Sequence, residues 1–145
     1  MSKNPPQDLK SHARFHPPFH FFLFPLITAN FIVAIVHVVQ HPSLGTVWYL
    51  VMSACAVLAV LTIRQYAVKV QDRVIRLEER LRLQSLAPAE WHTQIYRLNE
   101  DQLIGLRFAG DDEVVELAKQ ALEHNLTRKQ IKERIKIWRP DYWRV

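Results

Sequence analysis

The fold of this chain is decided by residues 19–63, which read FHFFLFPLITANFIVAIVHVV (19–39), QHPS (40–43) and LGTVWYLVMSACAVLAVLTI (44–63). Neither apolar run contains a Lys, Arg, Asp or Glu. Each run has about 20 residues, which is the length that a helix needs to cross a hydrocarbon layer about 30 Å thick. The sequence therefore predicts two transmembrane helices, 19–39 and 44–63, joined by an external loop at 40–43.

Basic residues lie before the first run and after the second run, but not between the two runs. Lys3, Lys10 and Arg14 precede the first run, Arg64, Lys69, Arg73 and Arg76 follow the second, and the loop between the runs carries no formal charge. Because Lys and Arg beside membrane spans stay on the cytoplasmic side, we expect both termini to be cytoplasmic, including the segment 1–18. A cleaved signal peptide is the alternative for the first run. Its length and the lack of a small-residue cleavage site after it disfavour that reading.

Asn30 places a polar amide near the middle of the first run. An antiparallel hairpin brings Ser53 of the second run to about the same depth. We therefore expect a hydrogen bond between the two helices, worth about 1 kcal/mol. A role for Asn30 in a permeation path is the alternative, but two spans supply few polar groups for one.

The second span is predicted to continue as a long cytoplasmic helix over 64–84, because this segment contains no Gly or Pro. Its apolar residues recur with spacings that alternate between four and three, which is a heptad seam: Ile63, Ala67, Val70, Val74, Leu77 and Leu81. The register also places Ser53, Ala56 and Val60 on the seam. Two partners remain open: a parallel second copy, in which Arg73 faces Glu78 of the partner, or the chain's own C-terminal domain.

Residues 85–145 are predicted to form a small bundle of short helices. Pro88 suits the first turn of a helix that runs to about Leu98. Capping-box pairs open two further helices, at Asn99 with Gln102 and at Thr127 with Gln130. Acidic residues open a helix over 111–124, and Asn125 fits its end. No segment alternates convincingly, so the predicted fold class is all-α.

The last predicted helix, residues 128–138, is basic and amphipathic. Its candidate interaction residues are Arg128, Lys132, Lys136, Trp138 and the following Arg139. A basic amphipathic helix next to a membrane most simply meets anionic lipid head groups or packs in its own bundle, and docking to a partner protein is also open. A helix-turn-helix with 128–138 as its reader helix is weakly specific, so nucleic acid is an unlikely partner.

Histidines spaced four apart are the candidates for metal or haem binding. They are His12, His16 and His20, then His37 and His41. Pro17-Pro18 breaks the first series, and the second span has no His, so we predict neither a metal nor a cofactor. The sequence contains no nucleophile elbow, phosphate loop or paired-cysteine motif, and we do not expect an enzyme.

Four stretches together resemble a bacterial family of small two-span membrane proteins classed as a domain of unknown function. They are HARFHPPFHFF (12–22), QDRVIRLEERLRL (71–83), LRFA (106–109) and IKERIKIWRPDYWRV (131–145). The resemblance implies a multi-pass protein of the bacterial inner membrane and implies no reaction. By this analogy, the residues to mutate first are Arg14, His16, Arg73, Glu78 and the segment 138–142.

These patterns together predict a non-enzymatic membrane accessory or scaffold protein that anchors a basic helical domain at the cytoplasmic face. Its expected partners are membrane lipids, including anionic head groups, and either further copies of the chain or the subunits of a larger membrane complex. One alternative is a membrane-tethered regulator that binds nucleic acid or an acidic partner through its basic helix. Another is a His-dependent metal or haem subunit.

Overall fold

The computed structural model describes Leu9 and residues 16–141. All the regular secondary-structure elements in these residues are helices. Within that described part no strand is formed, and a single isolated bridge joins Ala109 to Trp138. The chain divides into two compact units, a hairpin unit within Phe15–Lys69 and a C-terminal unit within Val70–Arg144. The predicted all-α class, with a helical hairpin followed by short helices, is confirmed.

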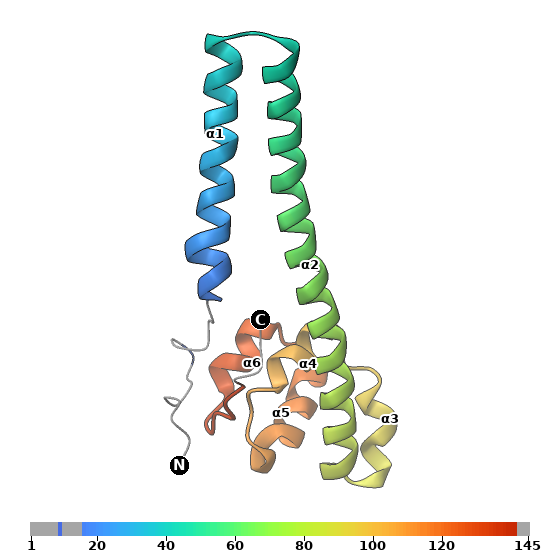
Figure 1. The fold of residues 1–145 in the computed structure, drawn as a ribbon. Helices are drawn as coiled ribbons and strands as arrows, with labels where there is room; N and C mark the ends of the chain where they lie inside the picture. The colour runs from blue at the N-terminus through green and yellow to red at the C-terminus, as the bar shows by residue number, and fades with distance from the viewer. Residues whose placement is uncertain (1–8, 10–15, 142–145) are drawn as a thin grey trace. The chain divides into compact units, whose positions relative to one another are not determined.

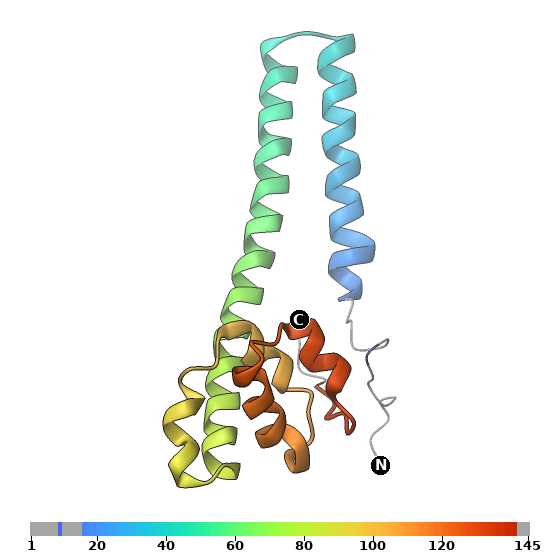
Figure 2. The same ribbon diagram turned by 180° about the vertical axis from the view of Figure 1, so that it is seen from behind.

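The hairpin unit contains a π-helical turn η1 (Pro18–Leu23), helix α1 (Phe24–Gln40) and the first part of helix α2 (Leu44–Leu86). The α1 and α2 segments of this unit run side by side in opposite directions (Figures 1 and 2). Ser43 closes the connection, since its backbone N–H donates to Thr46 Oγ1 at 3.0 Å and its Oγ accepts from the Thr46 N–H at 3.2 Å. Two helices, Pro18–Gln40 and Leu44–Leu86, are long and apolar enough to cross a membrane.

Helix α2 is continuous over 43 residues, as the absence of Gly and Pro from residues 64–84 predicts. At 1.5 Å per residue its length is about 65 Å, roughly twice the thickness of a hydrocarbon layer. Its last turns belong to the C-terminal unit.

The C-terminal unit packs five short elements against the 70–86 part of α2 (Figures 1 and 2). They are η2 (Ala89–Trp91), α3 (His92–Ile95), α4 (Glu100–Leu106), α5 (Asp111–Glu123) and α6 (Arg128–Arg134). Their apolar faces share one core whose fully buried members include Leu83, Ile95, Leu103, Phe108, Val114 and Ile131. A common core of this kind stabilises helices that are too short to persist alone.

Local capping signals give the helix boundaries that the sequence predicts. Asn99 and Gln102 form a reciprocal capping box at α4, and Thr127 and Gln130 form another at α6. Asn125 has a positive φ of 46°, and the Leu126 N–H donates to the Ala121 carbonyl at 3.0 Å. This arrangement is a Schellman motif, which satisfies a terminal carbonyl of α5.

Two predicted helices end earlier than expected. The helix predicted from Pro88 to Leu98 is a 3₁₀ turn followed by α3, which ends at Ile95. The helix predicted over 128–138 ends at Arg134, and Ile135 is already extended, with ψ of 125°. Lys136, Trp138 and Arg139 therefore lie on an extended segment, residues 135–141, which we call the C-terminal strap.

Non-helical partners explain why the strap leaves the helix. The Glu113 carboxylate accepts the backbone N–H of Lys136 at 3.1 Å and that of Ile137 at 2.9 Å. The Gly110 N–H donates to the Ile137 carbonyl at 2.8 Å, and the Arg139 N–H donates to the Phe108 carbonyl at 2.7 Å. Because buried backbone groups need partners, these bonds to other elements replace those of a further helical turn.

Candidate functional site

Asn30 forms the polar contact inside the hairpin unit. Its Nδ2 donates to Ser53 Oγ at 2.9 Å, which confirms the predicted bond, and its Oδ1 accepts the Tyr49 hydroxyl at 2.6 Å. Tyr49 was not predicted, although it lies four residues before Ser53 and thus on the same face of α2. Both ends of the amide are satisfied, so Asn30 fastens α1 to α2.

The heptad seam serves different surfaces along α2. Ser53 is 3% exposed and faces Asn30, while Val60, Ile63 and Ala67 line a cavity of the hairpin unit. The last four seam residues belong to the C-terminal unit, and we call them the α2 stripe: Val70, Val74, Leu77 and Leu81.

The α2 stripe is an exposed apolar surface. The exposed fractions of its four residues are 62%, 49%, 60% and 58% in chain order. By contrast, Ile75, Glu79 and Leu83 are 7%, 4% and 0% exposed, because the rest of the C-terminal unit packs on their side of α2. At 3.6 residues per turn these two sets occupy opposite faces of the helix. The described part of the C-terminal domain therefore does not cover the α2 stripe. Of the two partners that the sequence left open for this surface, the structure disfavours the chain's own C-terminal domain.

Arg73 and Glu78 flank the α2 stripe at the g and e positions of the heptad register. Both side chains are exposed. Among the described residues neither one forms an ion pair within the chain. Their charges remain available to a partner helix on this surface.

Two basic side chains of α6, Arg128 and Lys132, contact other residues of the C-terminal unit. Arg128 donates to Asp101 Oδ1 at 2.7 Å, and the Lys132 ammonium lies 5.0 Å from the centroid of the Phe108 ring. Both contacts tie α6 to the α4 region. Helix α6 has seven residues, so the helix considered as a reader helix over 128–138 is shorter than the sequence predicts.

The predicted interaction residues of the strap are also structural. The Trp138 ring packs against Phe108 at a centroid distance of 5.4 Å, and the Arg139 guanidinium lies 3.6 Å from Glu79 Oε1. Lys136 contributes its backbone N–H to Glu113. These contacts close the strap over the core.

Glu79 is a buried carboxylate that the sequence analysis did not single out. Its Oε2 accepts from Arg82 at 3.0 Å, and Arg82 also donates to Asp111 Oδ1 and to the Ala109 carbonyl, each at 2.7 Å. Burial raises the pKa of Glu79 above its usual value, and the attraction of Arg82 opposes that rise. This network joins α2 to the start of α5.

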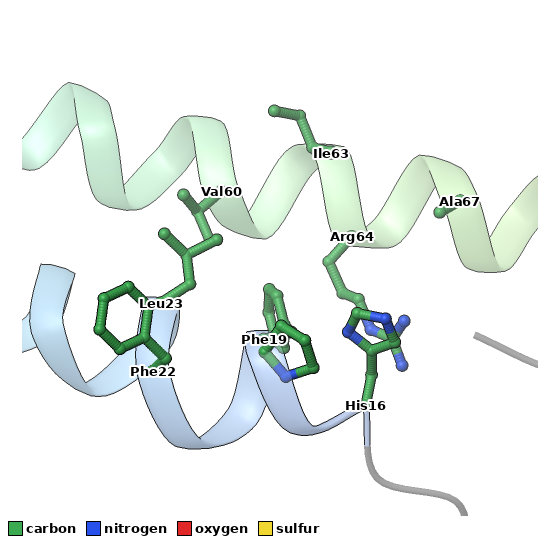
Figure 3. A pocket seen from close by; sticks show the side chains of 9 residues that line it. His16, Phe19, Phe22, Leu23, Val60, Ile63, Arg64 and Ala67 are labelled. Atoms are coloured by element: carbon green, nitrogen blue, oxygen red, sulfur yellow. The ribbon is translucent and has the colours of Figure 1, made fainter.

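A cavity of about 420 Å³ lies within the hairpin unit, between the start of the first helix and the middle of α2. Most of its described lining is apolar, with Phe22, Leu23 and Val60 at one end and Phe19 nearer the middle (Figure 3). The polar residues among the described lining are His16 and Arg64, at the other end (Figure 3). The Arg64 guanidinium lies over the Phe19 ring, 5.3 Å from its centroid. Arg14 lies outside the described residues.

The histidines do not gather into a metal site in the part of the chain that the structure describes, where no group of three or more His, Cys, Asp or Glu could hold an ion. His37 and His41 pack edge to face, with ring centroids 5.6 Å apart. The His20 ring nitrogen bonds the backbone of His16 at 3.0–3.1 Å.

Comparison with known proteins gives one match. The model of a family described as "Family of unknown function (DUF6526)" matches residues 1–145. Neither a curated protein nor a solved structure matches the chain.

Proposed function

The chain belongs to this family of unknown function, and we propose that it is an integral membrane scaffold that pairs with a second copy of itself along the α2 stripe. The outer surface of the hairpin unit supports membrane insertion. Its large apolar residues are exposed, among them Phe21, Phe22, Leu26, Val33 and Val39 at 71%, 69%, 57%, 57% and 75%. So large an exposed apolar surface is unfavourable in water and suits a hydrocarbon environment.

The distribution of charge supports an orientation with both termini in the cytoplasm. Arg64 is the first charged residue after the second apolar run, and the loop at 40–43 has no Lys or Arg. The positive-inside rule then places the C-terminal unit at the cytoplasmic face, in a bacterium at the inner membrane.

The single observation that carries the pairing is the exposed α2 stripe with its heptad spacing. Two copies inserted in the same direction hold their α2 helices parallel, which is the orientation in which Arg73 meets the partner's Glu78. The stripe is short for an isolated coiled coil. Confinement of both helices to one membrane raises their effective concentration and offsets that disadvantage.

Ion pairs within the C-terminal unit support a scaffold role. Arg128 pairs with Asp101 and Arg82 pairs with Glu79, and these contacts help to build the domain. Pairing along α2 would present two such domains side by side at the membrane.

Cysteine crosslinking in native membranes tests the pairing. In a Cys55→Ala background, Leu77→Cys places a thiol in the stripe, and Lys69→Cys places one at an exposed position of α2 outside it. We expect oxidation to give a covalent dimer with Leu77→Cys and little dimer with Lys69→Cys. Equal yields, no dimer, or a Leu77→Cys adduct with another protein alone would contradict pairing with a second copy.

Membrane insertion and orientation are tested separately. We expect the wild-type chain to resist extraction by alkaline carbonate, and a cytoplasm-specific reporter fused behind Val145 to be active. Release without detergent would refute the membrane assignment, and activity of an exterior-specific reporter would refute the orientation.

A further inference from the structure

We propose that the cavity of the hairpin unit binds an anionic phospholipid, with the phosphate at Arg64 and an acyl chain along the apolar lining. This inference rests on the membrane insertion proposed above. It adds a ligand site to the scaffold, and its residues are distinct from the α2 stripe.

The position of the cavity along the chain agrees with the level of a lipid head group. Arg64 directly follows the apolar run 44–63, and His16 directly precedes the Pro17-Pro18 start of the first helix. Both polar lining residues therefore lie where each span leaves the hydrocarbon. Phe22, Leu23 and Val60 lie further into the spans and at the other end of the cavity (Figure 3).

The form of the cavity fits an amphipathic ligand. Its volume of about 420 Å³ falls in the range of ligand pockets, about 300–1,000 Å³. A bare inorganic anion would leave the apolar part of this space unfilled. A phospholipid matches both parts of the cavity. Its charged phosphate would lie at the polar end, and its hydrocarbon chain would extend along the apolar end.

The chemistry of Arg64 favours a phosphate. Its guanidinium lies over the Phe19 ring, and this cation–π contact holds the group beside the cavity in advance of binding. A guanidinium carries five N–H donors in one plane, which suit the bidentate recognition of a phosphate.

The preference for an anionic over a zwitterionic lipid follows from the charge of the lining. The described residues that line the cavity include no Asp or Glu, so none of them would attract the ammonium of a choline head group. A head group with net negative charge would gain from Arg64 without placing a second cation beside it.

The test uses the full-length protein in detergent and measures bound lipid by native mass spectrometry. Phosphatidylglycerol and phosphatidylcholine with identical acyl chains are titrated in parallel, with inorganic phosphate as a third ligand. We expect the wild type to bind phosphatidylglycerol about fivefold more tightly than phosphatidylcholine, as one basic residue near a membrane surface contributes. Inorganic phosphate should neither bind measurably nor displace the lipid.

Three variants separate a defined site from general surface charge. Arg64→Gln should remove the preference for phosphatidylglycerol, and Ala67→Phe, which adds a ring to the lining, should weaken the binding of both lipids. Lys69→Gln removes a positive charge five residues further along α2, at a residue that is not among the described lining of the cavity. This variant should therefore keep the preference for phosphatidylglycerol. Equal loss in Arg64→Gln and Lys69→Gln would show general electrostatics and overturn the site.

The outcomes also distinguish this inference from the proposed function. Equal binding of the two lipids by protein that inserts into liposomes, or displacement of lipid by inorganic phosphate, overturns the lipid site alone. Protein that fails to insert overturns the membrane assignment and the lipid site with it.

Discussion

Substitution of Gly110 by Ala tests how closely the C-terminal strap packs on the core. A Cβ atom built at Gly110 would lie 3.1 Å from Ile137 Cγ2, 3.2 Å from the Ile137 carbonyl oxygen and 3.3 Å from Ile137 Cβ. The backbone of Gly110 is extended, with φ of −63° and ψ of 159°, which alanine adopts without strain. The substitution therefore probes the contact with Ile137 and not the conformation of the glycine.

The magnitude follows from two opposing effects. Inserting a methyl group into a packed contact costs about 1–3 kcal/mol, while replacing Gly lowers the entropy of the unfolded chain and returns about 0.4–1 kcal/mol. We expect the strap to be destabilised by about 1–2 kcal/mol, which corresponds to about a 5- to 30-fold rise in its open population.

Hydrogen exchange of the full-length protein in detergent, read by mass spectrometry, measures this effect. Peptides that cover 135–139 should exchange faster in Gly110→Ala, because the Arg139 N–H and the Glu113-bound amides are exposed when the strap opens. Gly45→Ala is the matched control: the nearest atom to its added Cβ is Ser43 Oγ at 3.8 Å, so the strap should not respond. Unchanged or slower exchange of the strap in Gly110→Ala would refute the close packing.

Three further predictions concern the hairpin, the buried carboxylate and the core. Asn30→Leu removes two hydrogen bonds, and such bonds average about 0.6 kcal/mol each in membranes. The variant should therefore weaken the association of the two hairpin helices by about 1 kcal/mol in a steric-trapping assay. Unchanged association would contradict the role of these bonds. Because the folded-state pKa of Glu79 is raised, the folded protein binds this proton more tightly than the unfolded chain does. The contribution of Glu79 to stability is therefore present below pH 4.5 and is lost as the pH rises through the raised pKa. Thermal melts should show this loss of stability in the wild type and not in Glu79→Gln. Parallel pH profiles of the two proteins would refute the prediction. Phe108→Ala should cost about 3–5 kcal/mol in denaturant unfolding, because the ring is 0% exposed and contacts Trp138, and a loss below about 1 kcal/mol would contradict its place in the core.

Features that depend on neighbours along the chain were predictable. The capping pairs at Asn99 and Thr127 act over three residues, so their sequence spacing alone indicates where α4 and α6 begin. The Asn30–Ser53 bond joins residues 23 apart, yet it was predictable because a short loop between two apolar helices fixes their register.

Features that depend on distant residues were not predictable. The end of α6 at Arg134 results from partners contributed by Glu113, Gly110 and Phe108, whereas the local pattern continues the helix to Trp138. The same contacts turn predicted surface residues of the strap into structural ones. The Glu79 network with Arg82, Asp111 and Arg139 was missed because a carboxylate in a charged helix gives no local sign of burial.

The sequence by itself determined the two apolar helices, the continuity of α2 and most helix starts, because hydrophobic length, the lack of helix breakers and capping act locally. Only the tertiary structure decided which face of α2 the C-terminal unit covers. Ile75 and Leu83 are buried against that unit, which leaves Val74 and Leu77 exposed on the other face. The helical periodicity of apolar residues alone does not specify which face of the helix contacts which partner. The cavity beside Arg64 was decided in the same way, since it forms only where the start of the first helix packs against the middle of α2, which is distant in sequence.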